Sequence, residues 1–143
     1  MFNVLLPAII AGTDSLIKKQ REENDTVYEY LDGKIRIVTF HNKGALLGRG
    51  KKKPVLVAFM SVVFTAFVAI VFILTLTKKG LKLLKFGLGL LLGGAFSNTY
   101  DRLKKGYVTD YMVFRHAPGF LKNVVFNLSD FAIMIGALIS ALQ

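Results

Sequence analysis

Two aspartates, Asp110 and Asp130, stand close to long apolar segments of the chain. A carboxylate beside hydrocarbon is energetically costly, and in membrane proteins such a residue usually serves a function. If the two carboxylates approach within hydrogen-bonding distance, their like charge raises one pKa strongly and the pair holds one shared proton. One carboxylate can then deprotonate a water molecule while the other donates a proton to a scissile carbonyl, which is the chemistry of aspartic proteases.

Three further polar side chains accompany these aspartates. Asn127 and Asp130 are spaced i, i+3, so a helix would place both on one face. Asn98 and Asn127 each carry a hydrogen-bond donor and an acceptor, and they could orient the aspartates or bind a substrate backbone. Arg102 follows Asn98 at the i+4 position, and its guanidinium could clamp a loop or a lipid phosphate. We expect Asp110 to come from a loop.

These residues by themselves suit three kinds of protein about equally. The first is a protease or another hydrolase, the second is part of a transporter or channel, and the third is a structural protein whose aspartates cap helices at the membrane interface. An ion or proton pathway, however, requires polar side chains near the middle of a span. Apart from small Ser and Thr residues, segments 55–77 and 81–97 offer only lysines at one end.

The composition indicates a small integral membrane protein. The chain has 143 residues, of which 53% are hydrophobic, and its mean hydropathy is +0.50. Its apolar residues form runs that are too long for ordinary strands. The absence of cysteine excludes disulfides, thiolate metal sites and a cysteine nucleophile, and the only histidines, His41 and His116, are far apart, so no zinc site is expected. No phosphate-binding or dinucleotide fingerprint occurs.

The net charge of +10 comes largely from Lys and Arg residues that flank the apolar runs. We therefore expect membrane lipids with anionic headgroups as partners, and no nucleic acid.

We predict an all-α membrane protein that forms one domain over residues 1–143. Gly89 and Gly93 form a GxxxG pair, which lets another helix approach closely, so the third span is expected in the centre of the bundle. The four transmembrane helices are expected at about residues 2–17, 55–77, 81–97 and 126–142.

The polar segments between the spans are expected to lie together at one membrane face. Residues 34–40 alternate polar and apolar side chains and predict a short strand, and the glycines of 41–50 indicate a turn. We interpret segment 99–125 as an interfacial loop with one short amphipathic helix. Four spans place this segment and segment 18–53 on the same side. The residues that gather there would be Asn42, Asn98, Asp110, Asn127 and Asp130.

Asp14 and Lys18 lie near the end of the first span at an i, i+4 spacing, so they share a helix face. From spacing alone, a simple ion pair at the membrane interface is favoured over a role in supporting the site.

Five short blocks of this chain resemble the lipoprotein signal peptidase family, also called signal peptidase II. Their order and intervals agree with that family, and the resemblance extends over nearly the whole chain, with 93–130 as its most specific part. The blocks are DSLIK at 14–18, NKGA at 42–45, GGAFSNTYDR at 93–102, VTDY at 108–111 and FNLSD at 126–130.

The resemblance implies a membrane aspartic endopeptidase that removes the signal peptide from diacylglyceryl-modified prolipoproteins, cleaving just before the lipidated cysteine. Asp110 and Asp130 would form its catalytic dyad. The family needs no metal or organic cofactor and is inhibited by globomycin-type cyclic peptides. The residues that would bind substrate or support the site are Asp14, Lys18, Asn42, Gly44, Asn98, Arg102 and Asn127.

The same resemblance implies a multi-pass protein of the bacterial inner (cytoplasmic) membrane, with the site facing the extracytoplasmic side, and we expect a monomer. A small β-cradle near residues 34–40 would cover the substrate, and a gating helix would fall within 103–107 and 111–122. An extracytoplasmic position of the site runs against the charge distribution of the chain, because Lys and Arg usually gather on the cytoplasmic side. The only basic residues left on that side would be Lys78, Lys79, Lys82 and Lys85.

Three positions depart from the family pattern. Ser97 stands where glycine is usual, Leu47 where phenylalanine is usual, and Ser129 where alanine is usual. None of these changes removes a catalytic group, although Ser97 could crowd a close helix contact. The alternative function is a non-catalytic paralogue that binds lipidated peptides or scaffolds a membrane complex.

Overall fold

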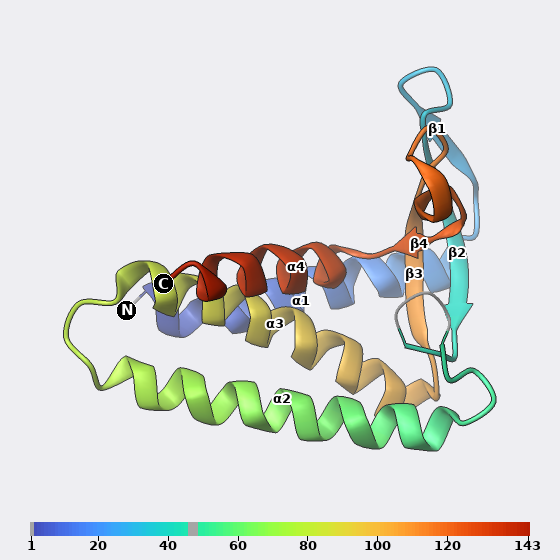
Figure 1. The fold of residues 1–143 in the computed structure, drawn as a ribbon. Helices are drawn as coiled ribbons and strands as arrows, with labels where there is room; N and C mark the ends of the chain where they lie inside the picture. The colour runs from blue at the N-terminus through green and yellow to red at the C-terminus, as the bar shows by residue number, and fades with distance from the viewer. Residues whose placement is uncertain (1, 46–48) are drawn as a thin grey trace.

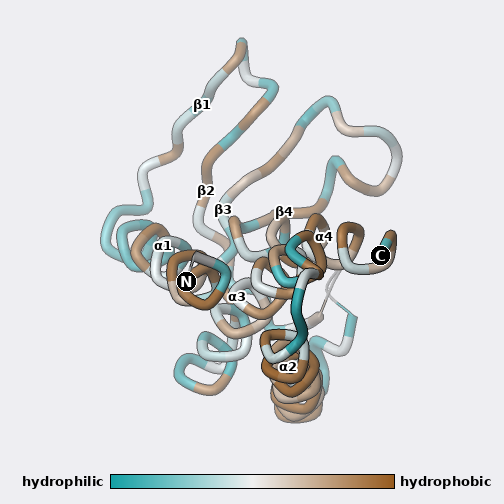
Figure 2. Tube along the Cα trace, turned by 90° about the vertical axis from the view of Figure 1, so that its left-hand side faces the viewer, coloured by the Kyte–Doolittle hydropathy of each residue, from teal (hydrophilic) through white to brown (hydrophobic). Residues whose placement is uncertain are grey.

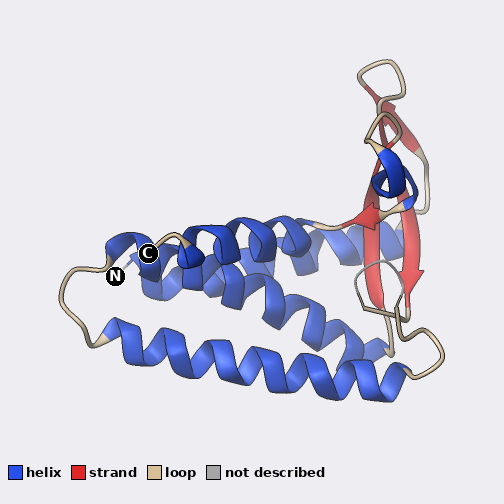
Figure 3. Ribbon diagram, viewed as in Figure 1, coloured by secondary structure: helices blue, strands red, loops and turns tan. Residues whose placement is uncertain are grey.

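A computed structural model describes residues 2–45 and 49–143, so the departure at Leu47 lies outside the described residues. The described chain forms four long helices and a small antiparallel sheet at one end of them (Figures 1 and 3). The helices are α1 (Phe2–Glu23), α2 (Pro54–Leu76), α3 (Lys82–Lys105) and α4 (Leu128–Ala141). The strands are β1 (Tyr28–Tyr30), β2 (Ile35–Asn42), β3 (Val108–Phe114) and β4 (Val125–Phe126), and η2 (Gly119–Asn123) is a 3₁₀ helix.

Helix α3 is the centre of the bundle, as the glycine pattern predicted, and it packs against α1, α2 and α4. The predicted pair Gly89 and Gly93 faces α1, where a Cβ atom on Gly93 would lie 2.8 Å from the Pro7 carbonyl oxygen. A Cβ atom on Gly94 would lie 2.5 Å from the Ser129 carbonyl oxygen of α4. Side chains at these positions would push the helices apart, so glycine permits the close packing on both sides of α3.

The helices continue beyond the apolar runs that predicted them. Helix α1 ends at Glu23 and α3 at Lys105, whereas the predicted spans ended at residues 17 and 97. The added turns of α1 are rich in Lys, Gln, Arg and Glu, and those of α3 contain Arg, Leu and Lys, all of which have high helix propensity. Helix α3 stops where Gly106 adopts a φ of 79°, a left-handed cap that glycine accepts without strain.

Helix α2 carries the most exposed apolar surface of the bundle. Figure 2 shows hydrophobic residues along most of its length, and Val55, Phe67 and Leu74 are more than half exposed. Its inner face contributes Val68 and Phe72 to a small core shared with α3. Within the described residues, α2 alone is both long and apolar enough to cross a membrane, and α4 is apolar but shorter. Exposed apolar surface of this extent marks a face that is covered in the native environment.

The sheet is larger than the sequence pattern predicted. Strand β2 confirms the predicted strand at 34–40, but it is one of four strands in the order β1-β2-β3-β4. All three neighbouring pairs are antiparallel, and a bulge between Ile37 and Phe40 interrupts the pairing of β2 with β3. The chain is therefore not purely α-helical.

Segment 99–125 is not the predicted interfacial loop with one amphipathic helix. It contains the last turns of α3, then β3, η2 and β4. The residues 103–107 and 111–122, for which the resemblance implied a gating helix, hold the end of α3, part of β3 and most of the short helix η2. The prediction that segments 18–53 and 99–125 lie together is confirmed, because both chain ends lie at the opposite end of the bundle (Figure 1).

Candidate active site

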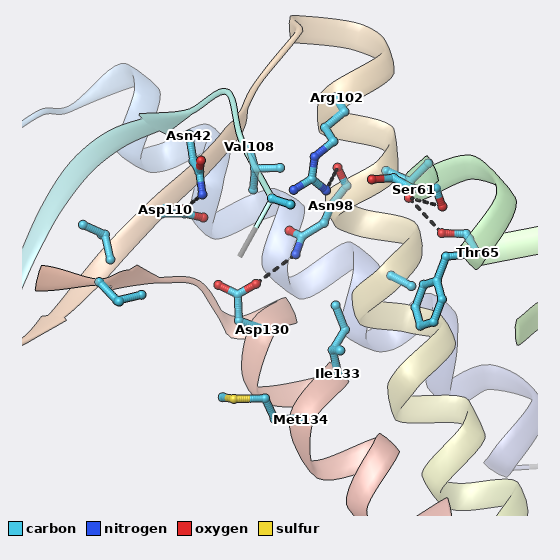
Figure 4. Close-up of a pocket in the computed structure, with 16 residues that line it drawn as sticks. Asn42, Ser61, Thr65, Asn98, Arg102, Val108, Asp110, Asp130, Ile133 and Met134 are labelled. Atoms are coloured by element: carbon cyan, nitrogen blue, oxygen red, sulfur yellow. Dashed lines mark hydrogen bonds between the residues drawn. The ribbon is translucent and has the colours of Figure 1, made fainter. Parts of the chain in front are cut away.

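The two aspartates come from different elements at the sheet end of the bundle (Figure 4). Asp110 lies within β3, where it pairs in register with Phe40 of β2, so the expectation that it comes from a loop is wrong. Asp130 lies in the first turn of α4. Both belong to the lining of one cavity, and only 2% of Asp110 is exposed.

Asn127 joins the two aspartates. Its side-chain nitrogen donates to Asp110 Oδ1 at 2.7 Å. Its side-chain oxygen accepts from the backbone nitrogen of Asp130 at 2.9 Å, and Asp130 Oδ2 accepts from the backbone nitrogen of Asn127 at 3.0 Å. This reciprocal pair is a capping box. Asn127 is therefore the N-cap of α4, and the i, i+3 spacing places it directly beside Asp130.

The other predicted asparagines each bind one aspartate. Asn98 donates to Asp130 Oδ1 at 3.0 Å, and Asn42 donates to Asp110 Oδ2 at 3.0 Å. Asn98 also accepts a hydrogen bond from Asn127 at 3.1 Å. The five residues that were expected to gather at one face therefore form one hydrogen-bonded cluster. Because each carboxylate is held by amide donors, its orientation is fixed before substrate arrives.

Arg102 and Gly44 connect this cluster to the loop after β2. The Arg102 guanidinium donates to the Asn98 carbonyl at 3.4 Å and to the Gly44 carbonyl at 3.2 Å, as expected for a loop clamp. The backbone nitrogen of Gly44 donates to Asn42 Oδ1 at 2.9 Å. Gly44 thus acts through its backbone, and it orients the amide that binds Asp110.

The cavity beside the aspartates has a volume of about 230 Å³. Its polar side carries the aspartates with Asn42, Asn98 and Arg102, and its other wall is built by helices α2, α3 and α4. That wall is mostly apolar, and it includes Phe64, Ala95, Ile133 and Met134. Such a cavity suits a molecule that has a polar reacting group next to a hydrocarbon part.

Burial and the negative charge of Asp130 together raise the pKa of Asp110 to about 7, although the hydrogen bonds from Asn42 and Asn127 oppose this rise. Lys18 also favours the charged form of Asp110. A carboxyl with a pKa in this range can hold or release a proton near neutral pH, as acid–base catalysis requires.

Asp14 and Lys18 form a fully buried ion pair, so the preference for a simple interfacial pair is wrong. Asp14 is 0% and Lys18 is 1% exposed, and Lys18 Nζ lies 2.7 Å from Asp14 Oδ2. Lys18 also donates to Asn98 Oδ1 at 2.9 Å and lies 3.1 Å from Asp101. The pair therefore reaches the aspartate cluster through Asn98, which agrees with the supporting role that the resemblance implied.

Three hydroxyl groups complete the surroundings of Asp14, and sequence reasoning missed them. Ser97 and Ser129 donate to Asp14 Oδ2 at 2.7 and 2.6 Å, and Tyr111 donates to Asp14 Oδ1 at 2.9 Å. Ser97 is buried, and its hydroxyl also accepts a hydrogen bond from Lys18 Nζ at 3.1 Å. No spacing pattern in the sequence indicated the two serines. Tyr111 could have been found if strand β3 had been predicted.

Among residues 2–45 and 49–143, no three or more His, Cys, Asp or Glu side chains converge as a set of metal ligands.

Comparisons with known proteins place this arrangement in context. A family model described as signal peptidase (SPase) II matches residues 6–143. A lipoprotein signal peptidase of Moorella thermoacetica is 34% identical over 148 aligned positions, which cover 98% of this chain and 90% of that protein. One of Halothermothrix orenii is 36% identical over 96 residues, and one of Pelotomaculum thermopropionicum is 38% identical over 100 residues. These last two matches cover 67% and 70% of this chain and 60% of each relative.

Solved structures share the fold. Two structures described as bacterial membrane enzymes, determined by the in meso method, superpose with TM-scores of 0.82 and 0.78. Both are 20% identical in sequence and cover 99% of this chain, and the chain covers 85% and 90% of theirs. The family match spans all of the residues that hold the aspartate cluster together. This chain belongs to the signal peptidase II family.

Proposed function

We propose that this protein is a membrane aspartic endopeptidase that removes the signal peptide from diacylglyceryl-modified prolipoproteins, cleaving just before the lipidated cysteine. The observation that carries the proposal is the single asparagine, Asn127, that binds Asp110 and caps the helix of Asp130. The family match and the relatives named lipoprotein signal peptidase support the substrate class.

The reaction requires only water and the two carboxyl groups. With one proton shared between Asp110 and Asp130, the ionised carboxylate takes a proton from water, and the water oxygen attacks the scissile carbonyl carbon. The protonated carboxyl donates to the carbonyl oxygen as the tetrahedral intermediate forms. One carboxyl then gives a proton to the amide nitrogen, and the other takes a hydroxyl proton from the intermediate. The C–N bond breaks, the signal peptide is released as a carboxylic acid, and the pair regains its single shared proton. A coupled pair titrates as a unit, so the acid and base roles belong to the pair.

Two cavities meet at Asp110, and they suit the apolar and the polar parts of the substrate. The first has the apolar helical wall described above, which fits the diacylglyceryl group and the hydrophobic signal peptide. The second cavity has a volume of about 330 Å³ and is built by the sheet, η2 and the loop before α2. Lys51 and Asn123 contribute polar side chains to it. We assign this second cavity to the polar chain that follows the lipidated cysteine.

The proposed topology has four transmembrane helices in the bacterial inner membrane, with the sheet on the extracytoplasmic side. Exposed apolar residues on the other three helices support this topology, since Leu16, Phe96 and Leu138 are more than half exposed. The reacting groups would then lie near the membrane surface, where a lipid-anchored substrate presents its cleavage site. The protein would act as a monomer among membrane lipids and bind globomycin-type inhibitors, as the family does.

The topology can be tested with one introduced thiol, because the chain contains no cysteine. Asp25→Cys lies in the exposed connection between α1 and β1. Labelling by a membrane-impermeant reagent in intact spheroplasts supports the proposed orientation. Labelling only after permeabilisation contradicts it.

The activity is tested with one prolipoprotein prepared with and without its diacylglyceryl group. We expect purified protein in lipid nanodiscs to cut the modified form and to leave the unmodified form largely intact. Mass spectrometry of the product should show a new amino-terminal lipidated cysteine. Binding of the modified substrate without any cleavage would instead favour the non-catalytic paralogue.

A further inference from the structure

The two neighbours of Asp110 in β3 face away from the cavity. Successive side chains of a strand alternate between its two faces, so Thr109 and Tyr111 point opposite to Asp110. Both are buried, with exposed fractions of 0% and 3%. Asp110 lines the cavity, whereas the hydroxyl groups of both neighbours bind carboxylates of α1, namely Glu22 and Asp14.

Tyr111 links three elements through one hydroxyl group. Its oxygen donates to Asp14 Oδ1 at 2.9 Å and accepts from the backbone nitrogen of Leu128 at 2.9 Å. Burial and the charge of Asp14 raise the pKa of Tyr111, so the phenol keeps the proton that it donates. Leu128 is the first residue of α4, directly after Asn127. The same hydroxyl therefore binds α1 and the start of the helix that carries Asp130.

Thr109 is held from two helices. Its hydroxyl donates to Glu22 Oε1 of α1 at 2.6 Å and accepts from Lys105 Nζ of α3 at 2.7 Å. Its backbone nitrogen donates to Asp101 Oδ2 at 3.3 Å. On the far side, Glu22 Oε2 lies 3.0 Å from His41 Nε2 of β2. The position of Thr109 is therefore fixed relative to α1, α3 and the neighbouring strand.

The α1 end of the Tyr111 link is itself immobile. Asp14 is completely buried, and its other oxygen binds Lys18, Ser97 and Ser129 at 2.7, 2.7 and 2.6 Å. A buried carboxylate with this many charge-assisted bonds cannot move without breaking several of them. Helix α1 thus offers a rigid reference for β3, although it contributes no residue to the lining of the first cavity.

We propose that Thr109 and Tyr111 are positioning residues that fix strand β3 to helix α1 and so hold Asp110 in register with Asp130. This inference rests on the proposed peptidase function. The direct partners of Asp110, Asn42 and Asn127, lie at the ends of β2 and at the start of α4. They orient the carboxylate, whereas the α1 links set how far β3 lies from α4. A displacement of about 1 Å is enough to lower a catalytic rate by as much as a hundredfold.

The test uses full-length protein in nanodiscs, with cleavage of a diacylglyceryl-modified prolipoprotein as the readout. Tyr111→Phe and Thr109→Val each remove one hydroxyl and keep the side-chain volume. We expect kcat to fall about tenfold in each variant while KM stays within about twofold. Thr109→Ser keeps the hydroxyl and should retain the wild-type kcat. Tyr30→Phe is the matched control, because Tyr30 lies in β1 and is 55% exposed.

A second measurement separates positioning from loss of fold. The folded fraction of each variant is measured by thermal unfolding, and kcat is compared per folded molecule. In a double-mutant cycle of Thr109→Val and Glu22→Ala, we expect the double variant to be no slower than either single variant. Such non-additivity would show that the hydrogen bond between these two side chains causes the loss of kcat. Unchanged kcat in Tyr111→Phe and Thr109→Val, or losses that only track the folded fraction, would overturn the inference. Wild-type protein that fails to cut the substrate would instead reject the proposed function, and the inference with it.

Discussion

Asn127 donates to Asp110 at 2.7 Å from the same side chain that caps the helix of Asp130. One residue therefore sets the start of α4 and the position of a carboxylate on β3. This coupling explains why two aspartates from a helix and a strand can act as a pair. It also means that the structural and chemical roles of Asn127 can be separated by substitution.

Asn127→Ser should separate those two roles. Serine is a good N-cap, so α4 should keep its capping interaction, but the short hydroxyl cannot reach both Asp110 and Asn98. We expect unfolding free energy within about 0.5 kcal/mol of wild type, and a loss of cleavage of about a hundredfold.

Asn127→Ala provides the comparison, because it removes both the cap and the bridge. It should lose similar activity and in addition about 1 kcal/mol of stability. Full activity in Asn127→Ser would show that the bridge to Asp110 is dispensable.

The pH dependence of cleavage should report the carboxyl pair. Because the pKa of Asp110 is raised from 3.8 to about 7, the pair keeps its catalytic proton in neutral solution and loses it as pH rises further. We therefore expect kcat/KM to decline as pH increases through about 7. Stability should follow the same sign, since the folded protein binds the proton more tightly than the unfolded chain and is destabilised as pH rises from about 4 to about 7.

Asp110→Asn should lack this stability change when both proteins are unfolded by denaturant at a series of pH values. Parallel stability curves for wild type and Asp110→Asn would contradict the raised pKa.

The buried pair Asp14–Lys18 should be essential for folding. Lys18→Met leaves the Asp14 carboxylate without its cation in a site that water does not reach. Breaking a buried pair in this way costs about 3–5 kcal/mol. Thermal unfolding in detergent should show a large drop in midpoint for Lys18→Met.

Lys19→Met is the matched control, because the side chain of Lys19 is 74% exposed. It should unfold close to wild type. A double variant, Asp14→Leu with Lys18→Met, should be more stable than Lys18→Met alone, since it leaves no unpaired charge. If Lys18→Met unfolded at the same midpoint as wild type, the buried pair would not contribute to stability.

Lys51 should influence which substrates are cut fastest. It lines the cavity assigned to the chain that follows the lipidated cysteine. We expect a substrate with Asp directly after that cysteine to have a kcat/KM several-fold above that of a matched substrate with Lys, and we expect Lys51→Glu to reverse this order. Lys52→Glu changes the same charge outside the cavity lining and should leave the order unchanged. If wild type and Lys51→Glu preferred the same substrate, the second cavity would not bind the chain that follows the lipidated cysteine.

Local patterns in the sequence predicted the parts of the molecule that depend on neighbouring residues. The apolar run before Lys78 predicted α2, the alternation at 34–40 predicted β2, and the pair Gly89 and Gly93 predicted the central helix. The order of the segments then predicted that the two aspartates and three asparagines lie at one end. The helix ends were misplaced because apolar composition marks the membrane region and not the hydrogen-bonded helix.

What the sequence could not predict depends on contacts between distant segments. Strand β3 is buried on both faces around Asp110, so it lacks the alternation that reveals a half-exposed strand. The i, i+4 spacing of Asp14 and Lys18 is the same for an exposed pair and a buried one. Their burial depends on Ser97 and Ser129, which come from other helices.

Replacement of Asp110 and Asp130 by isosteric amides shows whether the two carboxyl groups act together in peptide cleavage. Wild type, Asp110→Asn, Asp130→Asn and the exposed control Asp25→Asn are compared on one diacylglyceryl-modified prolipoprotein, with folding checked by thermal unfolding. We expect wild type and Asp25→Asn to cut at equal rates, whereas each dyad variant loses at least about a hundredfold in kcat without losing substrate binding. Cleavage by folded Asp110→Asn and Asp130→Asn at the wild-type rate would contradict this expectation.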